Sequence, residues 1–367
     1  MTTHPRPQRG LDELRPYVPG KPIEDVKREY GLTDVIKMAS NENPLGSSPK
    51  AVEAIMKAAT GLNIYPDGAS YDLRTALAQH FNVDFAQIAV GNGADDLILQ
   101  LSMAYLADDD EVVTSRSSFA MYDVYAQAMR AKMIKTPLAD GYCIDLNAMA
   151  EAISDRTRLV FVCNPNNPTG TMSTAAQIDA FLDRVPDHVL CVLDEAYNEL
   201  VESTEYPDSL RYVREGRPNV IVLRTFSKVY GLAGIRLGYG FAHPDVVNTL
   251  NKIKPAFSVN LLAQAAGIAA LEDTEFLQQT VDTNRAGRHQ LIDGCHHLGL
   301  EVAESHTNFI LVQVGSDAPA IQQRLLENGV IVRPCTGYDL PDFLRVSIGT
   351  EEENARFLTV LAKLLGK

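Results

Sequence analysis

The chain has 367 residues, of which 46% are hydrophobic, and it carries a formal net charge of −14 at pH 7. This composition is typical of a soluble globular protein, and the length leaves room for one large domain and a smaller one. The acidic balance argues against nonspecific binding to nucleic acid, and no apolar run approaches the roughly 18 residues that a membrane span needs. Any anionic ligand must therefore be bound by local arginines.

The cysteine pattern and the first residues bear on the compartment. Five cysteines are an odd number, they are widely spaced, and they form no C-x-x-C pair and no cluster with zinc spacing. This pattern predicts reduced, mostly buried thiols and no metal site. The opening MTTHPRPQRG has no apolar segment of the kind found in a secretory signal. We expect a cytoplasmic protein.

The first part of the chain, residues 1–40, is predicted to form an arm. Its segment around Tyr17 is rich in proline, which forbids a regular helix and leaves this tyrosine on an extended segment. A helix is predicted over residues 49–61, with a proline near its start and a glycine near its end. The turn that follows, residues 63–68, leaves Tyr65 exposed.

From residue 88 onward, short apolar segments alternate with helical patterns. Five segments have the length and character of buried strands: residues 88–90, 111–114, 159–163, 189–193 and 220–223. The alternation predicts an α/β fold in which helices cover both faces of a mostly parallel sheet. In such a sheet the ligand lies at the carboxyl ends of the strands. A polar or glycine-rich cluster occurs at these ends, which predicts a binding site there.

Beyond about residue 257 the pattern changes. A long segment rich in alanine and glutamine predicts a connecting helix that runs to about residue 292. The remainder alternates strand-like segments with helices near residues 317–327 and 351–365, which indicates a small α+β domain.

Residues 220–238 carry the strongest chemical signal. An apolar strand ends at Thr225, Ser227 and Lys228, and a glycine-rich segment that contains Arg236 follows. A lysine at the mouth of a buried strand suits an amine that forms an imine with an aldehyde cofactor, and the hydroxyls and guanidinium suit that cofactor's phosphate. Taken alone, the stretch fits a surface lysine in a strand-to-helix loop equally well.

Other strand ends carry residues typical of the same kind of site. Residues 91–95 form a glycine turn that opens a helix, where free N–H groups favour a phosphate, although the third glycine of a dinucleotide fingerprint is absent. Asp194 suits a protonated pyridine nitrogen, which needs an adjacent anion, or else the N-cap of a turn. Tyr197 and Asn167 are candidates to bond a ring hydroxyl, and Phe119 to stack on an aromatic cofactor. A structural turn or core packing is the alternative for each.

Two arginines interrupt or end apolar strands near the carboxyl end of the chain. Arg345 lies inside Phe343–Ser347, and Arg333 ends the run that begins at Val330. The planar fork of arginine binds a carboxylate or phosphate at two points, so the pair predicts an anionic substrate. Ion pairs with the acidic surface are the alternative.

The motifs RPYVPGKP, SNENPLG, YPDG, GNGADD, NPNNPTG, DEAY, TFSKVYGLAGIRLG and LRVSIGT occur in this order along nearly the whole chain. In this set the sequence resembles the fold-type I aminotransferases that use pyridoxal 5'-phosphate, and within them the histidinol-phosphate aminotransferases. The resemblance implies an N-terminal arm (1–40), a large cofactor-binding domain (41–275) and a small C-terminal domain (276–367). It also implies a homodimer that transfers an amino group between L-histidinol phosphate and 2-oxoglutarate in L-histidine biosynthesis.

The resemblance implies roles for the candidate residues. Lys228 would bond covalently to the cofactor and shuttle a proton, and Asp194 would pair with the pyridinium nitrogen. Asn167 and Tyr197 would bond the ring oxygen, and Phe119 would stack on the ring. To act as a base near neutral pH, the lysine needs a pKa roughly three units below its usual value of about 10.4. Burial and a neighbouring arginine both lower the pKa of a lysine.

The same resemblance assigns the anion-binding residues. The cofactor's phosphate would be held by the backbone of Ala94 and Asp95, by Thr225, Ser227 and Arg236, and by Tyr65 of a second subunit. Arg345 would bind the carboxylate of the glutamate donor. The phosphate of the other substrate would be bound by Arg345 with Arg333, Tyr17 and Asn43.

Three alternatives stay open from the sequence. An aromatic amino-acid aminotransferase of the same fold would use Arg345 for a carboxylate, and a phosphothreonine decarboxylase of similar architecture would release CO2. A regulatory domain that binds pyridoxal phosphate beside a DNA-binding module is a non-enzymatic alternative. The acidic balance and the lack of a basic helix-turn-helix segment argue against this last one.

Overall fold

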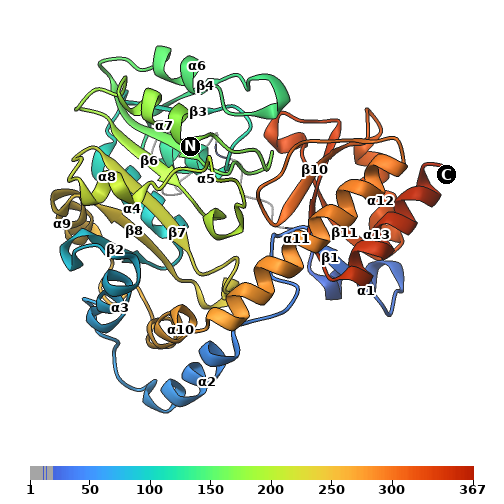
Figure 1. The fold of residues 1–367 in the computed structure, drawn as a ribbon, viewed down its shortest axis with the longest axis horizontal. Helices are drawn as coiled ribbons and strands as arrows, with labels where there is room; N and C mark the ends of the chain where they lie inside the picture. The colour runs from blue at the N-terminus through green and yellow to red at the C-terminus, as the bar shows by residue number, and fades with distance from the viewer. Residues whose placement is uncertain (1–10, 12–13, 15–19) are drawn as a thin grey trace, which may run out of the picture.

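The computed structural model describes residues 11, 14 and 20–367 and arranges them around two β-sheets (Figure 1). The larger sheet has seven strands in the order β2-β8-β7-β6-β5-β3-β4. These are β2 (Ile88–Gly91), β8 (Gly238–Ala242), β7 (Val220–Thr225), β6 (Leu190–Asp194), β5 (Thr157–Cys163), β3 (Glu111–Ser115) and β4 (Lys132–Thr136). Neighbours from β7 to β4 are parallel, whereas β8 is antiparallel to both β2 and β7. The predicted mostly parallel sheet is confirmed.

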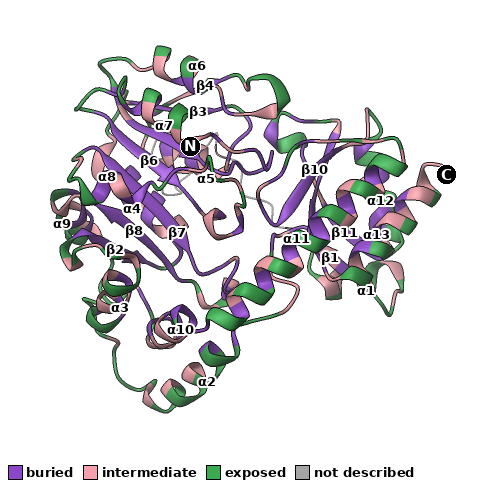
Figure 2. Ribbon diagram, viewed as in Figure 1, coloured by how far each residue is buried: buried purple, intermediate pink, exposed green. Residues whose placement is uncertain are grey.

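Helices cover both faces of this sheet because successive side chains of each strand point to opposite sides. Val160 and Val162 of β5 face one core, and Leu159 and Phe161 face the other. The first core includes residues of α2 (Pro49–Ala58), α3 (Tyr71–Phe81), α6 (Leu146–Glu151), α7 (Ala175–Leu182), α8 (Leu210–Arg214) and α10 (Leu261–Leu271). The second includes residues of α4 (Ala94–Tyr105), α5 (Met121–Ala128) and α9 (Pro244–Ile253). Figure 2 shows the strands buried between these layers, as predicted.

The smaller sheet has five strands in the order β1-β11-β12-β10-β9. They are β1 (Ile36–Met38), β11 (Val330–Pro334), β12 (Phe343–Ser347), β10 (Phe309–Gln313) and β9 (Glu301–Val302). Its helices are α1 (Ile23–Tyr30), α11 (Thr274–His297), α12 (Ala318–Glu327) and α13 (Glu351–Leu364). Strand β1 pairs in parallel with β11, so residues expected in the N-terminal arm belong to the sheet built by the end of the chain. The three-part domain division stays a prediction.

The connecting segment differs from the single long helix that was predicted. Helices α10 and α11 are separate, and the chain breaks between them at residues 272–273. Asp273 caps α11, and its carboxylate also accepts a hydrogen bond from Ser48 Oγ at 2.6 Å. A buried cap that is anchored to another segment ends one helix and starts the next, which composition alone does not reveal.

Several smaller features complete the fold. Short 3₁₀ turns occupy Ala59–Gly61, Phe85–Gln87, Asp140–Tyr142, Asn198–Leu200, Ala233–Ile235 and Thr336–Tyr338.

Four of the five cysteines are buried, and Cys143 is partly exposed. Among the described helices, none combines the length and the apolar character that crossing a membrane requires.

Candidate active site

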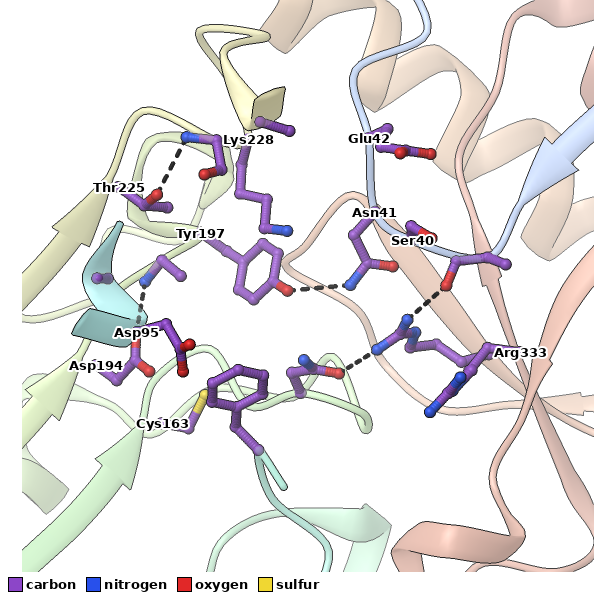
Figure 3. Close-up of a pocket in the computed structure, with 18 of the residues that line it drawn as sticks. Ser40, Asn41, Glu42, Asp95, Cys163, Asp194, Tyr197, Thr225, Lys228 and Arg333 are labelled. Carbon is purple, nitrogen blue, oxygen red and sulfur yellow. Dashed lines mark hydrogen bonds between the residues drawn. The ribbon is translucent and has the colours of Figure 1, made fainter. Parts of the chain in front are cut away.

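A cavity of about 280 Å³ opens at the carboxyl ends of the central strands, between the two sheets (Figure 3). Residues from both sheets line it. The predicted site residues among them are Ala94, Asp95, Phe119, Asn167, Asp194, Tyr197, Thr225, Ser227, Lys228, Arg236, Arg333 and Arg345. Ser40, Asn41, Glu42 and Cys163 also line the cavity, and none of these four was a predicted site residue.

The register of the parallel strands explains why these side chains meet. Cys163, at the end of β5, pairs with Asp194 at the end of β6, and Asp194 pairs with Leu223 of β7. All three strands therefore end at one edge of the sheet. The polar residues that follow each strand lie around the same space, as the position of ligands in α/β sheets predicts.

Lys228 lines this cavity and is partly buried. Burial, followed by the positive charge of Arg345, lowers the pKa of Lys228 to about 8, and Arg236 adds to the effect. The pKa of Lys228 is lowered, as predicted, but Arg345 lowers it more than Arg236, the arginine that was expected to do so. The Lys228 Nζ lies 5.8 Å from the centre of the Tyr197 ring. An amine with this pKa is partly neutral near pH 7.5, which a nucleophile or a base requires.

Asp194 is a buried carboxylate with two hydrogen bonds. It accepts one from Tyr122 Oη at 2.6 Å and one from the backbone N of Ala196 at 3.3 Å. Burial raises the pKa of Asp194 to about 6. This role of Tyr122 was not predicted, because the sequence pattern of a tyrosine on the buried face of a helix is the same as that of an ordinary core residue. It stacks on Phe161, with ring centres 4.4 Å apart. A buried carboxylate without a basic partner among the described residues suits a cationic ring nitrogen.

The glycine turn before α4 and Arg236 form a pocket suited to a phosphate. Gly93 has φ +91°, and a Cβ there would lie 2.6 Å from Nη2 of Arg236. A Cβ on Gly238 would lie 2.0 Å from the backbone N of Ala94. Both glycines are therefore needed for the close approach of β8 and Arg236 to the start of α4. The first N–H groups of a helix have no helical acceptor and attract an anion.

Arg345 lies on the opposite side of the cavity and is 5% exposed. Its Nη1 donates to Asn167 Oδ1 at 2.5 Å and its Nη2 to the carbonyl of Ala39 at 2.7 Å. No carboxylate of the described residues forms an ion pair with it. Arg333 lies beside it, because β11 and β12 place these two residues opposite each other. Two neighbouring guanidinium groups at a cavity suit an anionic substrate.

Two predicted residues, Asn43 and Tyr65, do not line this cavity. Asn43 Nδ2 donates to Val229 O at 3.0 Å and to Thr280 Oγ1 at 3.1 Å, and this side chain does not line the cavity. The substrate contact of Asn43 stays a prediction, and Asn41, two residues earlier, lines the cavity wall. Tyr65 is 79% exposed and stacks on Phe257. Tyr17 lies outside the described residues. In the described part of the chain, no group of three or more His, Cys, Asp or Glu side chains could hold a metal ion.

Comparison with known proteins places this arrangement in context. Residues 33–361 match the model of the class I and II aminotransferases. Histidinol-phosphate aminotransferase of Moorella thermoacetica is 47% identical over 365 residues, which cover 100% of this chain and 94% of that protein. The Akkermansia muciniphila enzyme of the same name is 48% identical over 355 residues, covering 96% and 97%. The crystal structure of histidinol-phosphate aminotransferase from Sinorhizobium meliloti in complex with pyridoxal-5'-phosphate has a TM-score of 0.92 and 30% identity, covering 100% and 99% of the two chains.

Proposed function

The chain belongs to the class I and II aminotransferase family, and on this premise we propose that it transfers an amino group between L-histidinol phosphate and 2-oxoglutarate in L-histidine biosynthesis. Its cofactor is pyridoxal 5'-phosphate. The resemblance predicted from the motifs is confirmed by relatives 47% and 48% identical over nearly the whole chain. The observation that carries the proposal is a partly buried lysine of lowered pKa that shares one cavity with Asp194 and two arginines.

Each residue has a definite part in this chemistry. When bound, the cofactor supplies an aldehyde that links to amines and a ring that takes up the electron pair of a broken C–H bond. Lys228 would form the covalent link to that aldehyde, and its amine, when neutral, would accept the proton from the substrate Cα and hold it for return to the product. Asp194 would keep the ring nitrogen protonated, since a buried anion favours a cation beside it. Phe119, which lines the same cavity, would contact a face of the ring.

The substrate side of the cavity explains why two unlike substrates share one site. 2-Oxoglutarate and histidinol phosphate both carry an anionic group, and a guanidinium fork binds a carboxylate or a phosphate at two points. Arg345 is held in place by Asn167 and Ala39, and Arg333 adds a second positive charge beside it. Arg345 is buried, which limits the competition of water and strengthens its attraction for an anion.

The substrate assignment is tested by comparing kcat/KM for histidinol phosphate, phenylalanine and phosphothreonine under identical conditions. We expect histidinol phosphate to be preferred over phenylalanine by at least about tenfold, or roughly 1.4 kcal/mol, because phenylalanine has no phosphate for the arginines to bind. Phosphothreonine carries both a phosphate and an amine, so its product as well as its rate must be measured. A tenfold preference for phenylalanine would instead identify an aromatic aminotransferase. Release of CO2 from phosphothreonine would identify a decarboxylase.

A homodimer with shared sites is part of the same proposal. Five large apolar side chains lie near the turn that carries Tyr65, and each is between 44% and 79% exposed: Met56, Leu62, Ile64, Tyr65 and Phe257. A cluster of exposed apolar side chains typically marks an interface with another protein. We propose that a second copy covers this surface and that Tyr65 enters the neighbouring cavity, where its hydroxyl bonds the cofactor's phosphate.

Co-expression of two inactive variants tests the sharing of sites. Tyr65→Ala and Lys228→Ala chains should each be poorly active alone, whereas a mixed dimer should regain one complete site, built from Lys228 of one chain and Tyr65 of the other. Activity of purified mixed dimers should approach about half that of the wild type, since each dimer has two sites. No recovery in mixed dimers of verified composition would contradict the placement of Tyr65.

The pH dependence of cofactor loading follows from Lys228. Below pH 8 its amine is protonated and cannot attack an aldehyde, so the rate at which the unloaded protein takes up cofactor should rise about tenfold per pH unit up to about pH 8 and level off above it. With a lysine of ordinary pKa, the loading rate would continue to rise up to about pH 10.4. Stopped-flow measurement of the visible absorbance checks this, and a plateau only above pH 10 would contradict the lowered pKa of Lys228.

A further inference from the structure

Asn41 joins the two sheets at the wall of the cavity. It follows β1, is 2% exposed, and has φ +55°. Its backbone N–H donates to Ser347 Oγ at 2.8 Å, and its carbonyl accepts from Asn308 Nδ2 at 2.9 Å. These two bonds attach its backbone to the smaller sheet and the segment before β10. Its side chain reaches the other way, and Nδ2 donates to Tyr197 Oη at 3.0 Å (Figure 3).

The hydrogen-bond network sets which way the Asn41 amide points. Ser347 Oγ accepts the backbone N–H of Asn41 and donates its only proton to Asn41 Oδ1 at 2.9 Å. Ser347 is buried, so turning the amide over would leave that serine proton without its acceptor. A buried donor left without an acceptor costs about 1 to 3 kcal/mol. The Nδ2 of Asn41 is thereby directed at Tyr197.

This direction determines what Tyr197 can do. A phenol has one proton to donate, and here its oxygen already accepts the amide N–H. Burial raises the pKa of Tyr197, so the phenol keeps its proton through the neutral range. The phenolic proton of Tyr197 must then be donated to a group other than Asn41. Tyr197 lines the cavity, so a bound ligand can supply the acceptor. The charged or titratable groups that also face Tyr197 are Lys228, Arg345, Asp194 and Cys163.

We propose that Asn41 is a positioning residue that makes Tyr197 a donor toward the ring oxygen of the cofactor. The relay runs from the Ser347 hydroxyl through the Asn41 amide to the Tyr197 phenol. The relay begins at Ser347 on β12, two residues after Arg345. The strand that carries the proposed substrate-binding arginine therefore also orients the Tyr197 phenol beside Lys228. The inference rests on the proposed function, because it needs a cofactor with an anionic ring oxygen.

Aspartate at this position provides a sharp test. It has the shape of asparagine and also tolerates a positive φ, but it replaces the N–H donor by an acceptor. The Tyr197 proton would then turn to the new carboxylate and away from the cavity. The added negative charge lies near Lys228 and acts in its own right, so the charge effect must be measured separately. The Tyr197→Phe background does this, since it has no phenolic proton to redirect.

The measurement is the apparent pKa of the visible absorbance band in protein loaded with pyridoxal phosphate. Tyr197→Phe should raise it by about 1 to 2 units, because the anionic ring oxygen loses a donor. Asn41→Asp should raise the pKa of the band by a similar amount in the otherwise wild-type protein. In the Tyr197→Phe background, the shift caused by Asn41→Asp should be smaller by at least roughly 0.5 unit. Equal shifts in both backgrounds would overturn the inference, because Asn41 would then act by charge alone.

Two further variants separate orientation from folding. Ser347→Ala removes the donor that orients the amide and should shift the band in the same direction by less. Asn308→Ala removes only the bond to the Asn41 carbonyl, and should lower the melting temperature of the unloaded protein without moving the band's pKa. If Asn308→Ala moves the band as much as Asn41→Asp, or Ser347→Ala leaves it in place, the relay is refuted. A wild-type protein that shows no visible band would overturn the cofactor assignment itself.

Discussion

Replacing Lys228 by alanine should abolish the visible absorbance band of the loaded protein and lower kcat by about 10⁴-fold or more. Proton transfer by a positioned base contributes about 10²- to 10⁴-fold on its own, and the covalent link to the cofactor is lost as well. Absorbance spectra and steady-state rates measure the two effects separately. Lys228→Arg should be equally inactive, because a guanidinium keeps the charge but does not release a proton near neutral pH.

The control for this variant is a lysine far from the cavity. Lys252 lies on α9 and is exposed, so Lys252→Ala should keep both the band and the rate. A Lys228→Ala protein that retains the visible band would show that another amine holds the cofactor.

The unloaded protein offers an independent check of the same lysine. The folded state lowers the pKa of Lys228 from 10.5 to about 8, so between these values the folded chain holds fewer protons on this amine than the unfolded chain. Stability should therefore rise with pH across that window in the wild type, and the cost of the buried charge is fully present below pH 8. Denaturant titrations should show this component missing from Lys228→Ala.

Replacing Arg345 by alanine should lower kcat/KM for histidinol phosphate by about 10²- to 10³-fold, or roughly 3 to 4 kcal/mol. Truncating one partner of a buried charge pair costs about 2 to 5 kcal/mol. The substitution also leaves Asn167 Oδ1 and the carbonyl of Ala39 without their donors. It removes a cation that lowers the pKa of Lys228, so the pH at which cofactor loading levels off should move upward.

Conservative and control variants test the role of the Arg345 guanidinium. Arg345→Lys keeps the charge but not the two-point geometry, and should recover only part of the loss, chiefly in KM. Arg324 lies exposed on α12, and Arg324→Ala should leave kcat/KM unchanged. If Arg345→Ala lost less than about threefold, or 0.65 kcal/mol, this arginine would not bind the substrate. Arg333→Ala should impair histidinol phosphate more than glutamate if it contacts only the phosphate.

Much of the site could be predicted because it lies at strand ends. A buried parallel strand needs a continuous apolar run, and the polar residue after that run is visible in the sequence. Lys228 and Asp194 were predicted in this way, and Arg236 from the glycine-rich segment that follows Lys228; all three line the cavity. Their motifs also carried the family resemblance, which the relatives confirm.

The tertiary structure decided the partners of these residues. Tyr122 bonds Asp194 from a helix 72 positions away, and Asn41 meets Ser347 across 306 positions. Asn41 and Asn43 look alike in the motif SNENPLG, yet only the first lines the cavity. The side chain of Asn41 bonds Tyr197 and Ser347, whereas that of Asn43 bonds Val229 and Thr280. Local patterns report on neighbours along the chain, whereas the orientation of a hydroxyl or an amide depends on groups that only folding brings within hydrogen-bonding distance.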